Sequence, residues 1–188
     1  MKFRAFIAVD VGPLPALLEL ADRLRATKAD IKLVEPENIH VTLKFLGDTD
    51  EDLVEDIHRH MADCVRDIEP FTLRLENMGA FPGMNYMRVV WVGMEGAEPL
   101  VQMAKALNAA LKPLGFRSDK KGFKPHLTIA RVRSPRNKND LQQAIEVHHE
   151  NSFGEVQVDR IVLKKSVLSP QGPTYYDVRE APLGNRDL

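Results

Sequence analysis

The sequence predicts an α+β protein with mostly antiparallel sheets, organised as two similar lobes. Alternating apolar residues, which are typical of strands, mark several segments of the chain. Some of these predicted strands follow one another directly and others are separated by predicted helices, which favours α+β over a regularly alternating α/β fold. One short motif, described below, occurs twice, with its copies 86 residues apart in a chain of 188. Because no linker or low-complexity tract interrupts the chain, residues 1–188 are expected to form one bilobal domain.

The first elements follow from the spacing of apolar residues. Residues 3–9 are apolar on both parities, so they predict a strand that is buried on both faces and therefore central. Helical spacing predicts a helix over residues 14–24, with Pro13 in its first turn. Residues 38–46 alternate and predict a strand that Gly47 ends. The side chains expected on its buried face are Ile39, Val41, Leu43 and Phe45, and those on its polar face are His40, Thr42 and Lys44.

The remainder of the chain continues this pattern. Thr49 or Asp50 can cap a helix whose apolar stripe spans residues 53–68. The further elements are expected in this order: strands at residues 71–77 and 86–92, joined by a loop with Gly79, Pro82 and Gly83; a helix at 100–111, closed by Pro113 and Gly115; a strand at 125–130; a short helix at 141–145; a pair of strands within 156–168; and a strand at 174–179.

The composition is that of a globular protein without disulfides. The chain is 44% hydrophobic and 28% charged, which excludes a disordered tail, a fibrous repeat and a disulfide scaffold. Cys64 is the single cysteine, so a reducing compartment is expected. The apolar run at residues 5–9 is too short for a signal peptide, and no segment reaches the roughly 18 apolar residues of a membrane span. We therefore expect a cytoplasmic protein with no membrane partner. We also expect a monomer, because no apolar stripe is left without an intramolecular partner.

The net charge of −1 conceals two segments of opposite sign. Residues 48–69 hold nine acidic and two basic side chains, whereas residues 112–138 hold nine basic side chains and the single acid Asp119. Such runs are often no more than solvated faces. The alternative is that the basic segment faces a polyanion, since phosphate contacts supply most of the affinity for nucleic acids. Charge by itself leaves both interpretations open.

The motif that carries chemistry is His-x-Thr followed by an aliphatic residue. It occurs at His40 and Thr42 and again at His126 and Thr128. Six histidines and six threonines in 188 residues predict about 0.2 chance pairs at this spacing, so two matched copies exceed chance. In a strand, residues two apart share a face, which places each histidine beside its threonine while the aliphatic neighbours point into the core.

Two histidines and two hydroxyl groups suit a displacement at phosphorus. A neutral histidine can take a proton from the incoming oxygen, and a protonated histidine can give a proton to the leaving oxygen. Threonine hydroxyls can donate hydrogen bonds to the non-bridging phosphate oxygens. A five-membered cyclic phosphodiester is a small, strained target that such a site could open without a metal.

The same residue types also have structural interpretations. Either motif copy alone would be a hydrogen-bonded surface pair, and a zinc site lacks a third ligand at matching spacing. Cys64 falls on the apolar side of a helix and is expected in the core. His58 and His60 are expected to be solvated. His148 and His149 are expected near a helix end, in a capping or exposed position.

Taken together, these segments resemble the 2H phosphoesterase superfamily, which is defined by two His-x-Thr/Ser-x motifs. The similarity is greatest to its RNA 2′,3′-cyclic phosphodiesterase branch, also called 2′-5′ RNA ligases. The stretches that carry it are RAFIAVDV at residues 4–11, ENIHVTLKFLG at 37–47, MRVVWVGM at 87–94 and KPHLTIARV at 124–132. The resemblance implies two α+β lobes related by a pseudo-twofold axis, with both motifs lining a central groove and the helices outside.

The resemblance also implies a role for each motif residue. His40 would be the proton donor to the leaving ribose oxygen, and His126 the proton acceptor that activates water. Thr42 and Thr128 would hold the phosphate oxygens, and Arg131 would add positive charge. Simple alternation places Arg131 on the face opposite His126, so it reaches the phosphate only if the strand ends or bulges there. An exposed or structural ion pair is the alternative for Arg131.

The function implied by the resemblance is metal-independent hydrolysis of RNA 2′,3′-cyclic phosphate termini to a 2′-phosphate by two histidines, with no cofactor and no metal. The expected partner is RNA with a cyclic phosphate end, with tRNA halves and small cyclic nucleotides as candidates. One alternative is another activity of the superfamily, on a small cyclic nucleotide or in 2′-5′ RNA ligation. The other is a non-catalytic module that binds RNA or nucleotides.

Overall fold

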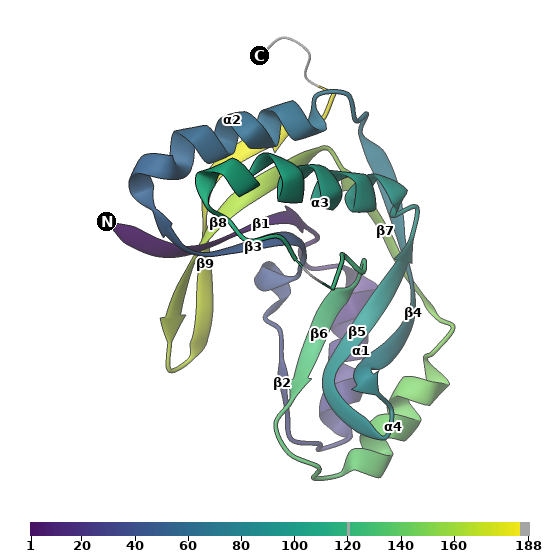
Figure 1. The fold of residues 1–188 in the computed structure, drawn as a ribbon. Helices are drawn as coiled ribbons and strands as arrows, with labels where there is room; N and C mark the ends of the chain where they lie inside the picture. The colour runs from purple at the N-terminus through teal and green to yellow at the C-terminus, as the bar shows by residue number, and fades with distance from the viewer. Residues whose placement is uncertain (120, 185–188) are drawn as a thin grey trace.

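The computed structural model describes residues 1–119 and 121–184, which form two antiparallel sheets and four α-helices (Figure 1). The four-stranded sheet has the order β3-β1-β8-β9, and the five-stranded sheet has the order β2-β6-β5-β4-β7. The strands are β1 (Lys2–Asp10), β2 (Ile31–Leu33), β3 (His40–Asp50), β4 (Phe71–Gly83), β5 (Tyr86–Glu95), β6 (Leu127–Val132), β7 (Ser152–Val158), β8 (Arg160–Ser169) and β9 (Gly172–Pro182), and the helices are α1 (Pro15–Ala26), α2 (Val54–Val65), α3 (Glu98–Ala110) and α4 (Lys138–Val147).

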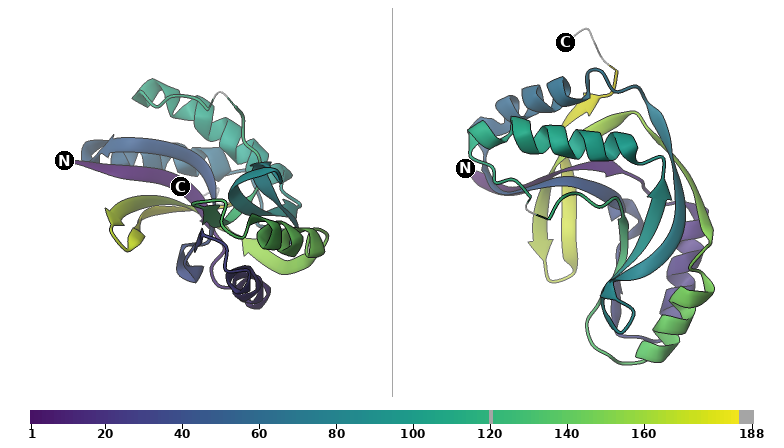
Figure 2. Two further views of the ribbon diagram at one scale, coloured as in Figure 1. Left: turned by 90° about the horizontal axis from the view of Figure 1, so that it is seen from below. Right: turned by 45° about the vertical axis from the view of Figure 1, so that its right-hand side comes forward.

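Each sheet is covered by two helices. One of them follows a strand of the same sheet in the chain, and the other follows a strand of the other sheet. α2 packs against β9 and α3 against β3, so both cover the four-stranded sheet. α1 and α4 contact each other and lie against β7 and β4 of the five-stranded sheet. Figure 2 shows both helix pairs on the outside of the molecule. The predicted α+β fold, with two antiparallel lobes and outer helices, is confirmed.

Strand β1 occupies the centre of its sheet, as its sequence predicts. Phe6 and Ala8 on one face and Ala5 and Ile7 on the other are all buried. Helix α1 follows but begins later than expected, because Pro15 rather than Pro13 takes the first helical position. Proline fits there because its missing N–H would have no partner within the helix.

Strand β3 is longer than its sequence predicts. Gly47 does not end it, and the strand continues to Asp50 with β1 paired alongside. Gly47 takes a positive φ of 71°, a backbone conformation that glycine adopts without steric cost. Thr49 therefore lies within the strand instead of capping a helix, and a 3-10 turn at Glu51–Leu53 precedes α2.

The alternation of buried and exposed side chains in β3 changes after Thr42. Lys44, expected on the polar face, is buried, and Phe45, expected in the core, is exposed. The cause is a bulge, because β1 pairs with Thr42 and with Lys44 but skips Leu43. A skipped residue shifts the side chains that follow it to the opposite face, here those of Lys44 and Phe45, before β1 also skips Leu46.

Differences in the second half have similar local causes. β4 runs through Gly79 to Gly83, where the sequence predicts a loop. Gly79 serves close packing, since a Cβ there would stand 2.6 Å from Cζ2 of Trp91. β7 and β8 follow each other in the chain but belong to different sheets, and β2 is absent from the prediction.

Among the described residues, no helix is both long and apolar enough to span a bilayer.

Candidate active site

The two histidines occupy equivalent positions at the start of their strands. His40 is the first residue of β3, and His126 directly precedes β6. In each ring Nδ1 lies 2.7 Å from the carbonyl oxygen two residues earlier, that of Asn38 for His40 and that of Lys124 for His126. A carbonyl oxygen can only accept, so each Nδ1 carries a proton and donates it. Nε2 is therefore the atom through which either ring can take up or release a proton.

The first motif also contains a hydrogen bond between its histidine and its threonine. Nε2 of His40 lies 2.9 Å from Oγ1 of Thr42. Because Nδ1 of the neutral ring is protonated, Nε2 accepts this bond and the hydroxyl of Thr42 donates it. Thr128 stands at the corresponding position of the second motif, two residues after His126.

A bulge follows the threonine in both motifs. β1 skips Leu43, the residue after Thr42, and β5 skips Ile129, the residue after Thr128. The shift of alternation turns the third residue after each threonine to the face that carries the histidine. These two residues are Phe45 and Arg131, and both are exposed.

Arg131 therefore lies on the same face as His126, which simple alternation does not predict. The sequence requires a bulge for Arg131 to reach the site, and the structure has this bulge at Ile129. Its guanidinium is also close enough to His40 and Tyr175 to lower the pKa of both groups, acting against burial at Tyr175 and together with burial at His40. A residue of the second motif thus acts electrostatically on the histidine of the first.

Backbone pairing brings the two motifs together. β2 pairs with β6, and beyond the end of β2 the N–H of Val34 donates to the carbonyl oxygen of Ile129, with an N···O distance of 2.9 Å. The 3-10 turn Pro36–Asn38 follows and leads into His40. β3 and β6 approach each other although they belong to different sheets. β2, which pairs with the strand of the second motif, therefore leads directly into the first motif.

Aromatic rings surround His40. The ring centroid of Phe6 lies 5.0 Å and that of Tyr175 5.4 Å from the imidazole. Burial lowers the pKa of His40 below the ordinary histidine value, and the hydrogen bond to Asn38 and the Asp10 carboxylate offset part of this effect. Burial of an ionisable ring disfavours its charged form. The neutral form of His40 is thus favoured in the free protein.

The neighbouring aromatic residues did not stand out in the sequence. The ring of Phe81 meets His126 edge-on at 5.3 Å, and Phe81 in turn stacks on Trp91. Phe6 and Tyr175 are predicted only as strand residues. An aromatic residue in a strand is ordinarily a core residue, so only the structure could place these rings against the two histidines.

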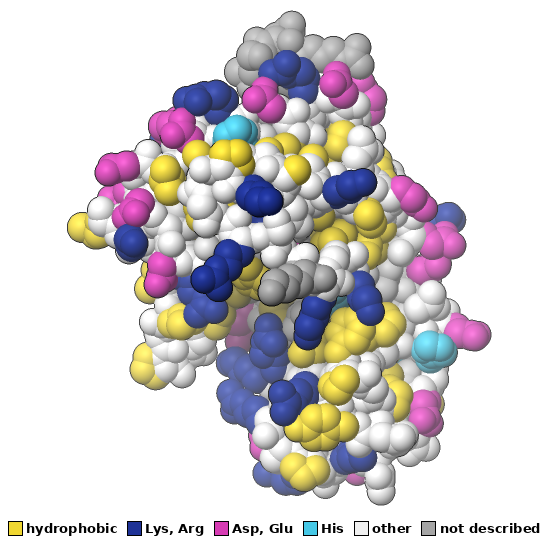
Figure 3. Space-filling model, in the orientation of Figure 1, with side chains coloured by type: hydrophobic (Ala, Val, Ile, Leu, Met, Phe, Trp, Pro, Cys, Tyr) yellow, Lys and Arg dark blue, Asp and Glu magenta, His cyan; other side chains and the backbone are white. Residues whose placement is uncertain are grey.

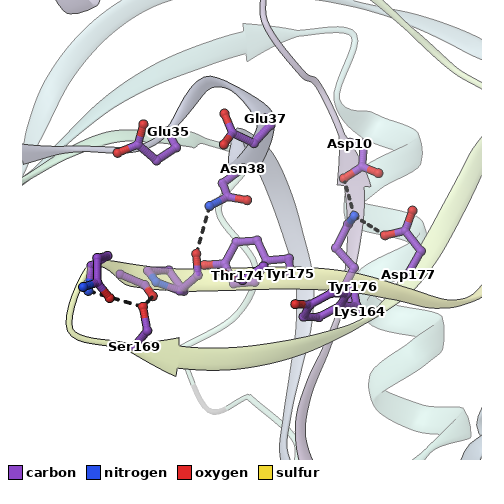
Figure 4. A pocket seen from close by; sticks show the side chains of 13 residues that line it. Asp10, Glu35, Glu37, Asn38, Lys164, Ser169, Thr174, Tyr175, Tyr176 and Asp177 are labelled. Carbon is purple, nitrogen blue, oxygen red and sulfur yellow. Dashed lines mark hydrogen bonds and ion pairs between the residues drawn. The ribbon is translucent and has the colours of Figure 1, made fainter.

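An acidic pocket of about 640 Å³ lies next to His40, at the end of β1 (Figure 4). In it, Nζ of Lys164 lies 3.0 Å from a carboxylate oxygen of Asp10 and 2.5 Å from one of Asp177. Asp10 also stands opposite His40 in the register of β1 and β3. The carboxylates that line the pocket are Asp10, Glu35, Glu37 and Asp177. The sequence signals for this cluster are weak: Asp10 is a charged residue at the end of an apolar strand, and Lys164 is a charged residue in the middle of one.

Basic side chains gather around the hollow between the two lobes (Figure 3). Lys121 and Lys124 precede His126 in the chain, Arg131 and Arg133 follow it, and all four are exposed. Lys120 lies outside the described residues. The acidic segment at residues 48–69 instead runs from the end of β3 through α2, which covers the other face of the four-stranded sheet.

The remaining candidate side chains lie elsewhere. His148 is at the C-terminal cap of α4, as expected, but it is buried, with Nε2 3.1 Å from the guanidinium of Arg23. Cys64 is half-buried, and burial raises the pKa of its thiol to about 11, which disfavours a reactive thiolate. His58 donates from Nε2 to the carbonyl of Glu180. Within residues 1–119 and 121–184, no group of three or more His, Cys, Asp or Glu side chains is arranged to hold a metal ion.

The family of the chain follows from comparison with known proteins. The family model of the 2′-5′ RNA ligase superfamily matches residues 13–167. The chain belongs to this superfamily. The matched range includes both His-x-Thr motifs and the bulges that follow them. The prediction of an enzyme of this family is confirmed.

Members of the 2′-5′ RNA ligase superfamily match nearly the whole chain. A protein of Methanothermobacter thermautotrophicus named RNA 2′,3′-cyclic phosphodiesterase is 38% identical over 180 residues, which are 95% of this chain and 97% of that protein. One of the same name from Aquifex aeolicus is 34% identical, over 96% of this chain and 97% of that protein.

Solved structures show the same fold. A Thermus thermophilus crystal structure superimposes with a TM-score of 0.79 at 30% identity, covering 97% of this chain and 99% of that one. The Escherichia coli LigT structure in complex with 3′-AMP has a TM-score of 0.71 at 24% identity, covering 97% and 99% of the two chains, and it supports the fold alone.

Proposed function

We propose that this protein hydrolyses 2′,3′-cyclic phosphates at RNA 3′ ends without a metal and leaves a 2′-phosphate. The observation that carries the proposal is the matched pair of histidines, each with Nδ1 held by a backbone carbonyl and Nε2 left for proton transfer. Full-length relatives named RNA 2′,3′-cyclic phosphodiesterase support the choice of substrate. We also propose that residues 1–188 act as one domain, since one hydrophobic cluster includes core residues of both sheets.

The proposed reaction is one displacement at phosphorus. A water oxygen attacks the phosphorus while Nε2 of His126 accepts its proton. The bond between phosphorus and O3′ of the ribose breaks, and Nε2 of His40 donates a proton to O3′. The products are a 3′-hydroxyl and a 2′-phosphate, and solvent exchange then returns both histidines to their starting protonation states. Acid and base groups of this kind each contribute about 10²–10⁴ in rate.

The other motif residues would stabilise the charge that develops on the phosphate. The hydroxyls of Thr42 and Thr128 can donate to its two non-bridging oxygens. Arg131 would place a guanidinium beside those oxygens, since it shares the face of His126 and acts on His40. A guanidinium can donate two parallel hydrogen bonds to a phosphate, which fixes orientation as well as charge.

The lowered pKa of His40 bears on its role as the acid. Burial disfavours the protonated ring in the free protein. A bound phosphate is negatively charged and favours the protonated ring, so binding of substrate would raise the pKa of His40. Because kcat/KM reports the free enzyme, it is expected to fall as the pH rises through a value below the ordinary 6.5 of histidine.

The test uses a short RNA that ends in a 2′,3′-cyclic phosphate, incubated with the protein in EDTA. The product mass and digestion with 2′- and 3′-specific enzymes locate the phosphate, with His40→Ala and His126→Ala alongside. We expect a 2′-phosphate from the wild type and a loss of at least about 10²-fold in rate in each variant. His58→Ala is the matched control, because His58 is a histidine remote from both motifs, and it should retain the wild-type rate.

Other outcomes identify the alternatives. No turnover on RNA but turnover on small cyclic nucleotides would replace the RNA substrate with a mononucleotide. Joining of a 5′-hydroxyl RNA to the cyclic end would indicate ligation. Binding of the RNA with no turnover of either substrate would indicate a non-catalytic module. Activity that EDTA abolishes and a divalent metal restores would contradict the metal-free step.

A further inference from the structure

A second pocket lies at the free edge of β3, beside Phe45. β3 is an edge strand of the four-stranded sheet. Residues 45–48, Asp50 and Leu53 form one wall of the pocket, and residues 114–117 form the other. The pocket has a volume of about 440 Å³, which lies within the range of small-molecule sites, about 300–1,000 Å³. The side chain of Phe45 is 64% exposed, so most of its ring is available to a ligand.

Phe45 belongs to a row of aromatic rings that begins at the first motif. The ring of Phe6 lies 5.0 Å from that of His40 and 6.2 Å from that of Phe45. Phe6 and Phe45 are paired in the register of β1 and β3, so they project from the same face. Nucleic-acid bases stack on aromatic side chains whatever their sequence. Phe6 is buried between its neighbours, so within the row it is the exposed ring of Phe45, at the pocket, that offers such a surface.

A basic segment connects the same pocket to the second motif. Residues 115–119 and 121–125 lie between the pocket and His126 in the chain and carry Arg117, Lys121 and Lys124, all of them exposed. Arg117 itself lines the pocket. Basic side chains along a groove hold the phosphates of a single strand while aromatic rings hold its bases. The pocket thus combines both kinds of contact.

Lys44 holds the wall that carries Arg117. Its side chain is only 2% exposed, and Nζ donates to the carbonyl oxygen of Arg117 at 2.9 Å and to Oδ1 of Asn108 at 2.6 Å. Asn108 belongs to α3, so the buried ammonium joins β3, α3 and the segment after it. The pocket wall is therefore fixed next to Phe45 by a hydrogen-bonded core residue.

Charge distinguishes this pocket from the one on the other side of His40. The pocket at the end of β1 is lined by four carboxylates, and its single lysine is already paired with two of them, so it repels a phosphate chain. The Phe45 pocket has two carboxylates, Asp48 and Asp50, at the end of β3 remote from His40. Asp50 is ion-paired with Lys2 at 3.7 Å, and Asp48 stands opposite Arg4 in β1.

We propose that the Phe45 pocket binds the nucleotide that precedes the cyclic-phosphate nucleotide in an RNA 3′ end. Its base stacks on Phe45, and its phosphate faces Arg117 and the basic segment that leads to His126. The terminal nucleotide lies beside His40, and the strand continues towards Phe45 and away from the acidic pocket. This inference rests on the proposed function, since it assigns an upstream subsite to the same substrate.

The test compares kcat/KM for a 2′,3′-cyclic mononucleotide with kcat/KM for a dinucleotide that ends in the same cyclic nucleotide, at one salt concentration. We expect the wild type to prefer the dinucleotide. Phe45→Ala should reduce the ratio of the two values by about 5- to 150-fold, the loss expected for one stacked base. Phe45→Trp should retain the ratio, because tryptophan also offers a ring face.

Two further variants serve as controls. Leu168 is 64% exposed, like Phe45, and Tyr176 is an aromatic residue, 54% exposed, that lines the acidic pocket. Leu168→Ala and Tyr176→Ala should both leave the ratio unchanged. A fall in the ratio for Tyr176→Ala alone would show that the strand runs through the acidic pocket and would overturn the proposal.

The remaining outcomes also decide. A wild type that turns over both substrates equally well, or a Phe45→Ala variant that keeps the wild-type ratio, would overturn the subsite while leaving the proposed reaction intact. Equal losses on both substrates would make Phe45 part of the site for the reacting nucleotide instead. A wild type that turns over neither substrate would overturn the proposed function and this inference with it.

Discussion

The guanidinium of Arg131 lies close enough to the imidazole of His40 to add to the lowering of its pKa that burial causes, although the two residues belong to different sheets. The bulge at Ile129 turns Arg131 to the face of His126, and the approach of β3 and β6 brings it to His40. One cation therefore serves both motifs. This arrangement links the electrostatics of the first histidine to a residue of the second motif.

Replacing Arg131 by alanine should raise the pKa of His40. Removal of a nearby positive charge favours the protonated imidazole, so the titration midpoint moves to higher pH. NMR titration of the His40 ring protons measures it, with Arg133→Ala as the control because Arg133 is exposed on the same segment and does not act on His40. Arg131→Ala should also lose about 10- to 100-fold in kcat/KM, because the contact between the guanidinium and the phosphate is removed. An unchanged midpoint would contradict the proximity of Arg131 to His40.

Replacement of Thr42 separates the hydroxyl from the methyl group. Thr42→Ala removes the hydroxyl that donates to Nε2 of His40 in the free protein and to a phosphate oxygen in the proposed reaction. It is expected to reduce kcat by about 10-fold or more, since the hydrogen bond to the charge that develops on the phosphate is lost. Thr42→Ser keeps the hydroxyl and should retain most of the rate. Steady-state kinetics on the cyclic-phosphate RNA distinguish the two. Equal losses in both variants would assign the effect to packing of the methyl group.

Lys44 and Phe45 test the bulge in β3 through stability. Lys44→Ala leaves a cavity and removes the donor to the Arg117 carbonyl and the Asn108 side chain, so it should cost about 2–5 kcal/mol of unfolding free energy. Phe45→Ala should cost less than about 1 kcal/mol, because its ring is exposed. Urea unfolding measures both variants. Simple alternation predicts the opposite order, so a larger loss for Phe45→Ala would contradict the bulge.

The sequence is sufficient to locate the two motifs and most strands, because residues two apart in a strand share a face whatever their partners are. It is not sufficient to locate the bulges. Whether Leu43 or Ile129 has a partner depends on the register of β1 and β5, which lie far from them in the chain. For that reason Lys44 and Phe45 are predicted on the wrong faces and Arg131 is left undecided.

Residues contributed by distant segments are also beyond the reach of local patterns. Asp10 and Tyr175 approach His40 only because β1 lies between β3 and β8 and because β9 follows at the sheet edge. Gly79 reads as a turn residue in the sequence, yet it lies within a strand because the Trp91 ring occupies the space of its side chain. In each case a tertiary contact overrides the local preference.

The central claim is that His126 acts as the base on water and His40 as the acid on the ribose O3′. A substrate in which sulfur replaces the bridging O3′ tests it most directly, because a thiolate, with a thiol pKa of about 8.5, leaves without being protonated. The measurement is the rate of thiol release and of oxygen-substrate cleavage by wild type, His40→Ala and His126→Ala. The account predicts that sulfur restores most of the rate to His40→Ala and little to His126→Ala. Rescue of His126→Ala alone, or equal losses of both variants on both substrates, would contradict it.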